Sequence, residues 1–247
     1  MKGMKIWAGV LSLALVVSSC GSMSNTGKGA LIGTAAGGAV GTGLGALIGK
    51  LAGNTKMGTA IGAAAGAAAG TGIGALIGNK MDKAKKAAEA IQNAQVESVE
   101  LNGLKAVKVT FEGGILFKTS DATLSDQAKT SLTQLAGVLK TYNDADVSIL
   151  GHTDATPWRN STPAQSAEKN KTLSLQRAQS VQNHLLGQGV SSIQIRSVEG
   201  LGQDYPVADN STAAGQAQNR RVEVYLYPSQ AMIEAAKIEA ANNGTLQ

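Results

Sequence analysis

Glycines at every fourth position over 29–53, and again over 58–78, are the feature that most restricts how this chain can fold. Four residues advance an α-helix by slightly more than one turn, so glycines with this spacing line one helix face. Glycine costs about 1 kcal/mol per residue in an isolated helix relative to alanine. A helix so rich in glycine therefore needs a closely packed backbone partner, as helices have in lipid. The glycines are Gly29, Gly33, Gly37, Gly41, Gly45, Gly49 and Gly53, then Gly58, Gly62, Gly66, Gly70, Gly74 and Gly78.

Two stretches without a charged residue, 29–49 and 57–79, carry most of these glycines. Each is long enough to cross about 30 Å of hydrocarbon as a helix. We predict that segment 28–80 is a glycine-zipper helical hairpin that associates with a membrane and with further copies of itself. The segment resembles the glycine-zipper regions of bacterial envelope lipoproteins. Its large apolar residues are few, so a periplasmic hairpin or an oligomeric stack outside lipid is the alternative.

The N-terminus has the features of a secretory signal. Lys2 and Lys5 precede an apolar run over 6–17 that is too short to span a bilayer, and small residues then lead to Cys20. Residues 17–20 resemble a bacterial lipobox, in which the signal is removed before the cysteine and the thiol is acylated. We predict a signal peptide over 1–19, a lipidated N-terminus over 20–27 with the lipid on Cys20, and an outer-membrane location. A secreted protein with an unused thiol is the alternative.

Composition argues against several classes of function. Cys20 is the only cysteine, which rules out an intramolecular disulfide and a cysteine metal site. Loss of Lys2 and Lys5 with the signal lowers the net charge from +5 to +3, too weak and scattered for nucleic-acid binding. We predict no metal, no cofactor and no nucleic-acid partner.

The rest of the chain divides by composition. We predict a helical linker over 81–103 that acts as a solvated spacer, a globular domain over 104–228, and a C-terminal helix and tail over 229–247. Alternating or continuous apolar runs predict strands over 106–111, 147–150, 193–195 and 221–227. Helical periodicity predicts helices over 126–139, 173–186 and 230–241. This alternation favours a small layered α/β or α+β domain.

Charged residues gather around the predicted second strand and second helix. Asp154 directly follows the strand, at the end where sheet folds tend to place binding sites. Arg177 shares a helix face with Asn170 and lies beside the apolar stripe, where an unpaired charge is costly. Arg177 therefore needs an anionic partner. A structural salt bridge to Asp154 would supply one without a ligand, and Asp154 itself could simply cap a turn.

Four motifs in order carry a family resemblance. They are Gly-His-Thr-Asp at 151–154, Asn-x-x-Leu-Ser-x-x-Arg-Ala-x-x-Val at 170–181, Pro-Val-Ala-Asp-Asn at 206–210 and Asn-Arg-Arg-Val-Glu at 219–223. Together they resemble the OmpA-like peptidoglycan-binding domain over about residues 104–228. The resemblance implies an α+β fold, a βαβαβ domain whose small mixed sheet has helices on one side.

The same resemblance implies a ligand and the residues that hold it. Asp154 and Arg177 would grip the diaminopimelate of the peptidoglycan stem peptide, because a carboxylate suits its ammonium and a guanidinium suits its carboxylate. Thr153 and Asn170 would add neutral hydrogen bonds. Arg220 is a second candidate for a ligand carboxylate, and since Arg220 and Arg221 alternate along a strand, at most one of them should face the pocket.

The chain departs from the family pattern between residues 155 and 169, where the loop looks longer than usual and contains Trp158. Such a loop would change which peptidoglycan fragments fit. Trp158 would either cover the site or pack the loop.

These observations favour a non-enzymatic lipoprotein that tethers the outer membrane to peptidoglycan. An enzyme that cleaves peptidoglycan is disfavoured, because two histidines, one acylated cysteine and no Gly-x-Ser-x-Gly motif leave little with which to build a catalytic site. A third interpretation makes the glycine-zipper hairpin the active part, as an oligomeric membrane factor or an envelope-assembly factor.

Overall fold

The computed structural model describes residues 72–101 and 103–243. The predicted signal peptide over 1–19, the lipidated segment 20–27 with Cys20, and residues 28–71 of the predicted hairpin lie outside the described residues.

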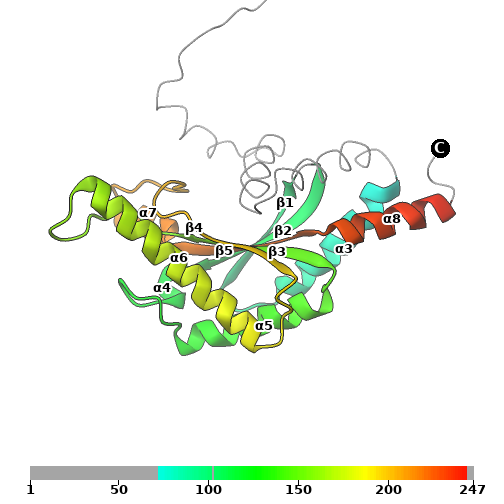
Figure 1. The fold of residues 1–247 in the computed structure, drawn as a ribbon, viewed down its shortest axis with the longest axis horizontal. Coiled ribbons are helices and arrows are strands. Elements are labelled where there is room, and N and C mark those ends of the chain that lie inside the picture. The colour runs from blue at the N-terminus through cyan, green and yellow to red at the C-terminus, as the bar shows by residue number, and fades with distance from the viewer. Residues whose placement is uncertain (1–71, 102, 244–247) are drawn as a thin grey trace, which may run out of the picture.

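A five-stranded mixed sheet organises the described chain (Figure 1). The strand order is β1-β2-β5-β3-β4, in which β3 and β4 are parallel and the other neighbours are antiparallel. The strands are β1 (Ala94–Leu101), β2 (Leu104–Glu112), β3 (Ala145–His152), β4 (Ile195–Gly200) and β5 (Arg221–Pro228). The helices are α3 (Gly72–Ala88), α4 (Gly113–Leu116), α5 (Asp126–Thr141), α6 (Pro163–Gly187), α7 (Ala213–Asn219) and α8 (Gln230–Asn242).

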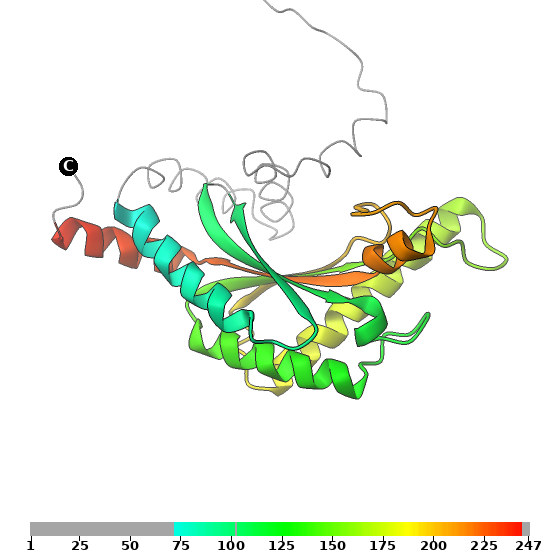
Figure 2. The same ribbon diagram turned by 180° about the vertical axis from the view of Figure 1, so that it is seen from behind.

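The main hydrophobic core lies on one face of this sheet. Apolar side chains of α3, α5, α6 and α8 share a single buried cluster with inward residues of the strands, such as Val109 and Val224. Figure 2 shows α3, α5 and α6 together on that side. Strand alternation explains the arrangement, since every second residue of β2 and β5 is apolar and points to the same face. The predicted α+β fold, with a mixed sheet and helices on one side, is confirmed.

The region around the end of the predicted hairpin requires a correction. Residues 72–88 form one helix, α3, which crosses the expected boundary at residue 80 and packs against β2 and α8. Ile73 and Ile77 from the predicted hairpin, and Met81 and Ala84 from the predicted linker, are buried in the domain core. Their spacing of three or four residues puts them on one apolar face. This part of the chain therefore packs in the core, and it is not a solvated spacer. Within the described ranges, no helix combines the length and the apolar composition needed to cross a bilayer.

The prediction of a helical linker up to residue 103 is also wrong after Ala88. Residues 94–101 form the edge strand β1, which pairs with β2 in an antiparallel register that sets Val96 opposite Val109. A backbone φ of +80° at Gly103, which glycine adopts without strain, helps the chain reverse direction between the two strands. An edge strand tolerates charged residues, and β1 contains two glutamates. They weaken the apolar alternation by which a strand is predicted from sequence.

Two further boundaries differ from prediction. The third predicted strand, 193–195, is displaced: β4 begins at Ile195, and Ile193 is 75% exposed. Gln194, directly before β4, has a buried side chain that donates hydrogen bonds to the carbonyls of Leu139 and Tyr142. Helix α6 begins at Pro163, ten residues before the predicted start at 173, so the loop after Asp154 is shorter than expected.

Candidate functional site

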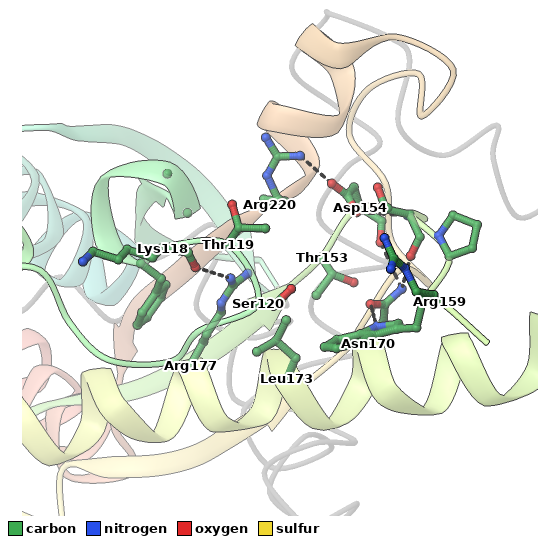
Figure 3. Close-up of a pocket in the computed structure, with 16 residues that line it drawn as sticks. Lys118, Thr119, Ser120, Thr153, Asp154, Arg159, Asn170, Leu173, Arg177 and Arg220 are labelled. Carbon is green, nitrogen blue, oxygen red and sulfur yellow. Dashed lines mark hydrogen bonds and ion pairs between the residues drawn. The ribbon is translucent and has the colours of Figure 1, made fainter. Parts of the chain in front are cut away.

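A pocket with a cavity volume of about 500 Å³ lies beside the end of β3 (Figure 3). Its walls come from the 117–120 segment after α4, the 153–159 segment after β3, one face of α6 and the residue before β5. All the predicted ligand-binding residues line it, namely Thr153, Asp154, Asn170, Arg177 and Arg220. The structure thus brings together four segments that are far apart in the sequence.

Two glycines allow the backbone to approach closely enough to assemble this pocket. A Cβ on Gly151 of β3 would lie only 2.0 Å from the carbonyl oxygen of Ser174 on α6. A Cβ on Gly113 would lie 2.8 Å from the carbonyl oxygen of Arg220, to which the Gly113 N–H donates at 2.7 Å. Glycine is the residue that permits such contacts. The first contact sets Thr153 and Asp154 beside α6, and the second fixes Arg220 next to α4.

Arg177 is a buried cation. The residue is 4% exposed, and the central carbon of its guanidinium lies 5.1 Å from the centroid of the Phe117 ring. Its Nε donates to the carbonyl of Asp121 at 2.9 Å, and its Nη2 donates to the carbonyl of Lys118 at 3.3 Å. Burial lowers the pKa of Arg177, and the nearby charge of Arg220 lowers it further. An arginine still remains protonated at physiological pH. In the described chain no carboxylate forms an ion pair with it, so the pocket contains a buried positive charge without an anionic partner.

Asp154 pairs with a different arginine. Its Oδ2 accepts a hydrogen bond from Nη1 of Arg220, and its Oδ1 accepts from the backbone N–H of Thr156 at 3.0 Å. The expectation that Asp154 caps a turn is therefore correct, but the alternative in which it satisfies Arg177 in a direct salt bridge is wrong. The carboxylate nevertheless remains on the pocket wall.

Arg220 and Arg221 point to different places, as their alternation predicts. Arg220 lines the pocket with a side chain that is 38% exposed. Arg221 is buried elsewhere, where its Nε donates to Oε1 of Glu223 at 2.7 Å.

Thr153 offers an unused polar group. The residue is 5% exposed and lines the pocket, and its backbone N–H donates to the carbonyl of Gly202 at 2.9 Å. Its hydroxyl oxygen is buried and has no hydrogen-bond partner among the residues that the structure describes. Because buried polar groups are nearly always paired, this hydroxyl is a candidate for contact with a ligand.

Asn170 has its side chain engaged within the protein. Its Oδ1 accepts the indole N–H of Trp158 at 2.7 Å, and its Nδ2 donates to the side chain of Gln203 at 3.0 Å and more weakly to the carbonyls of Asp154 and Thr156. This geometry makes Asn170 a residue that orients the 154–158 loop. Its direct contact with a ligand stays a prediction.

Part of the pocket has no signal in the sequence. The loop 118–120 and Phe117 contribute one wall, and nothing in their local pattern distinguishes them from an ordinary turn. Arg159 lies on the opposite side of the pocket (Figure 3), and the neighbouring Trp158 lines the pocket as well. Trp158, expected either to cover the site or to pack the loop, does both in part: its indole N–H donates to Asn170 of α6, which packs the loop, and the residue lines the pocket. Among the described residues, no group of three or more histidine, cysteine or acidic side chains is arranged to hold a metal ion.

Comparisons with known proteins identify two regions of the chain. Residues 116–220 match the model of the OmpA family, and residues 1–82 match that of the YMGG-like Gly-zipper. The chain is 44% identical over 114 residues to "Probable lipoprotein YiaD" of Escherichia coli K12, covering 46% of this chain and 48% of that protein. It is 38% identical over 119 residues to "Peptidoglycan-binding protein ArfA" of Mycobacterium bovis, covering 48% of this chain and 34% of that protein. The chain thus spans less than half the length of these curated relatives.

Among solved structures, a putative MotB-like protein from Desulfovibrio vulgaris has a similar fold, with a TM-score of 0.50 and 22% sequence identity. The similarity covers 61% of this chain and 91% of that one. At this level of identity the similarity establishes the fold alone.

Proposed function

Residues 116–220 form an OmpA-family domain, and from this premise we propose that the protein binds peptidoglycan noncovalently, as a non-enzymatic tether between the outer membrane and the cell wall. The observation that carries the proposal is the buried guanidinium of Arg177, which lines the pocket without an ion-pair partner in the described chain. A buried charge of this kind is costly unless an anion neutralises it. The name of one relative, ArfA, specifies peptidoglycan binding, which agrees with this assignment.

The proposed ligand is the free end of diaminopimelate in the stem peptide, which carries one ammonium and one carboxylate. Arg177 takes the carboxylate, since two of its donor nitrogens are held by backbone carbonyls and the remaining N–H groups are available. Asp154 takes the ammonium. The Thr153 hydroxyl, which lacks a partner, adds a neutral hydrogen bond between them.

Arg220 and Asn170 act in this proposal mainly by positioning. Arg220 holds the carboxylate of Asp154 at the pocket wall and lies where it can share the ligand carboxylate. Asn170 holds the loop that follows Asp154. Pre-arranged partners reduce the conformational entropy that binding would otherwise cost.

The N-terminal part of the protein supplies the membrane side of the tether. Acylation of Cys20 after removal of residues 1–19 anchors the chain in the outer membrane, and the domain then lies in the periplasm. One acyl chain gives only marginal membrane binding, so further chains or contact of residues 28–71 with the bilayer secure the anchor. The match of residues 1–82 to the Gly-zipper model and the resemblance to a probable lipoprotein support this arrangement.

The test is retention of the full-length protein on purified peptidoglycan sacculi. We expect Asp154→Ala and Arg177→Ala each to abolish retention, because removing one partner of a desolvated charge pair costs about 2–5 kcal/mol. Lys83→Gln is the matched control, since Lys83 is exposed on α3, outside the pocket. Melting temperatures must show that each variant still folds. Wild-type retention of both pocket variants would contradict the proposal.

A second candidate function assigns the activity to the glycine zipper, as an envelope-assembly or oligomeric membrane factor, and the Gly-zipper match favours it. Deletion of residues 28–71 tests it, because complementation of envelope defects by the shortened lipoprotein would exclude it. The deletion stops at residue 71 because Ile73 and Ile77 belong to the core of the folded domain.

A further inference from the structure

The pocket holds more positive charge than a single zwitterion requires. Arg159, Arg177 and Arg220 line it, and Asp154 is the one carboxylate among its lining residues. Asp154 is already paired with Arg220. Lys118 also lines the pocket, but in Figure 3 its ammonium points away while its carbonyl faces Arg177. Arg159 and Arg177 are therefore the two guanidiniums that remain without an acidic partner in the described chain.

Arg159 stands on a loop that is held in place. The neighbouring Trp158 is fixed at three points: its indole N–H donates to Asn170 at 2.7 Å, its backbone N–H donates to Ser166 at 3.0 Å, and the ammonium of Lys169 lies 5.8 Å from its ring centroid. The loop then turns at Asn160, whose φ of +54° lies in the left-handed region that asparagine tolerates best after glycine.

The first turn of α6 fixes the other end of this loop. Thr162 and Gln165 form a reciprocal capping box, and Pro163 occupies the first turn. Arg159 therefore lies in a short segment whose two ends are held by the contacts of Trp158 and by the capping box of α6. Among the described residues the Arg159 guanidinium forms no hydrogen bond or ion pair, and the Arg159 carbonyl accepts a hydrogen bond from the Ser161 hydroxyl at 3.4 Å.

The two unpaired guanidiniums come from different walls of the pocket. Figure 3 shows Arg177 rising from α6 beside the 118–120 loop, and Arg159 on the other side of Thr153 and Leu173. We propose that Arg159 forms a second anion subsite, so that the pocket binds a ligand with two separate carboxylates. This inference rests on the proposed function and specifies its ligand more narrowly.

In a stem peptide, this subsite binds the α-carboxylate of the glutamyl residue next to diaminopimelate. That carboxylate is free because the glutamyl residue is linked to diaminopimelate through its side-chain carboxyl group. Amidation of that carboxylate removes the charge and leaves the rest of the ligand unchanged. The pocket then distinguishes the acid form from the amide form of the same peptide. Diaminopimelate itself contacts Arg177 and Asp154 in both forms.

The experiment measures binding of two synthetic tripeptides to the full-length protein in detergent by isothermal titration calorimetry. Both are L-Ala–γ-D-glutamyl–meso-diaminopimelate, one with the glutamyl α-carboxylate free and one with it amidated. We expect the wild type to bind the acid form about fivefold more tightly, the scale of a partly exposed ion pair. Arg159→Gln should remove this preference by weakening the acid form alone. Lys83→Gln, which loses the same charge on the exposed side of α3, should keep the preference.

The outcomes separate this inference from the function on which it rests. If the wild type binds neither tripeptide, the proposed function fails. If it binds both with equal affinity, or if Arg159→Gln weakens both equally, peptidoglycan binding stands and the second subsite is refuted.

Discussion

The carboxylate of Asp154 pairs with the guanidinium of Arg220, from a residue 66 positions later in the chain, and leaves Arg177 without a direct acidic partner. Arg177 instead donates to two backbone carbonyls and lies over an aromatic ring. Carbonyl dipoles and a ring face partly stabilise a buried cation but do not neutralise it. The geometry of the pocket therefore favours binding of an anion at Arg177, and Arg220 holds the carboxylate of Asp154 nearby.

Arg220 should contribute less to binding than Arg177. Its side chain is 38% exposed, so its ion pair is weakened by solvent. We expect Arg220→Gln to reduce tripeptide affinity roughly threefold to fivefold, against a loss of roughly thirtyfold or more for Arg177→Ala. Calorimetric titration of both variants gives the comparison. Equal losses would make Arg220 a principal ligand of the carboxylate.

Thr153→Val should separate binding from stability. The Thr153 hydroxyl is buried and has no partner among the described residues, so its removal leaves no group unpaired. We expect the melting temperature to stay the same or rise, while affinity for the tripeptide falls roughly fivefold, the value of one neutral hydrogen bond. Thr153→Ser, which retains the hydroxyl, is the control. A stability loss with unchanged affinity would show that Thr153 is structural only.

A buried charge cluster on the opposite face of the sheet from the main core should govern acid stability. Glu223 accepts hydrogen bonds from Arg221 at 2.7 Å and from the Tyr225 hydroxyl at 2.8 Å, and His152 lies 3.4 Å away. Burial by itself would raise the pKa of Glu223, but His152 and Arg221 outweigh it and hold this pKa well below its ordinary value of 4.5. A carboxyl with a depressed folded-state pKa stabilises the fold above the unfolded value and loses that contribution as pH falls.

Glu223→Gln should accordingly lower the free energy of unfolding at pH 7 by about 3 kcal/mol, because it leaves Arg221 buried without its partner. The wild type should lose stability as pH falls below 4.5, and the variant should lose less over the same interval. Urea denaturation across this pH range measures both. Glu234→Gln, which removes an exposed carboxylate from α8, should leave the pH dependence almost unchanged. A similar acid sensitivity in Glu223→Gln would assign the effect to other titratable groups, such as the buried His152, whose pKa is lowered by burial.

Helix α3 should contribute directly to the stability of the domain. Ile77 is 1% exposed and belongs to the main core, although it lies in a stretch whose composition suggests a membrane helix. We expect Ile77→Ala to reduce the free energy of unfolding by about 3 kcal/mol. In Gly78→Ala, the added methyl group meets nothing within 4 Å, so stability should hold or rise by about 0.5–1 kcal/mol. Chemical denaturation of the full chain in detergent compares the two. An unchanged stability in Ile77→Ala would show that α3 packs only weakly on the domain.

The sequence predicted those parts of the fold in which a local pattern is strong. The strand at β2, with Val107, Val109 and Phe111 on one face, and the helix at α5 both followed from periodicity. Hydrophobic periodicity did not predict the elements that are largely polar. The first ten residues of α6 and the edge strand β1 have too few apolar residues to show their period, and packing or pairing with neighbours decides their conformation.

The motifs that resemble a known family pointed to five of the residues that line the pocket, namely Thr153, Asp154, Asn170, Arg177 and Arg220. The pairing of their charges depends on the tertiary structure. The partners of Asp154 and Arg177 lie 56 to 66 residues away along the chain, on segments that β3, β5 and α6 bring to one edge of the sheet. Ion pairs depend on distance in space, which no spacing within a motif specifies.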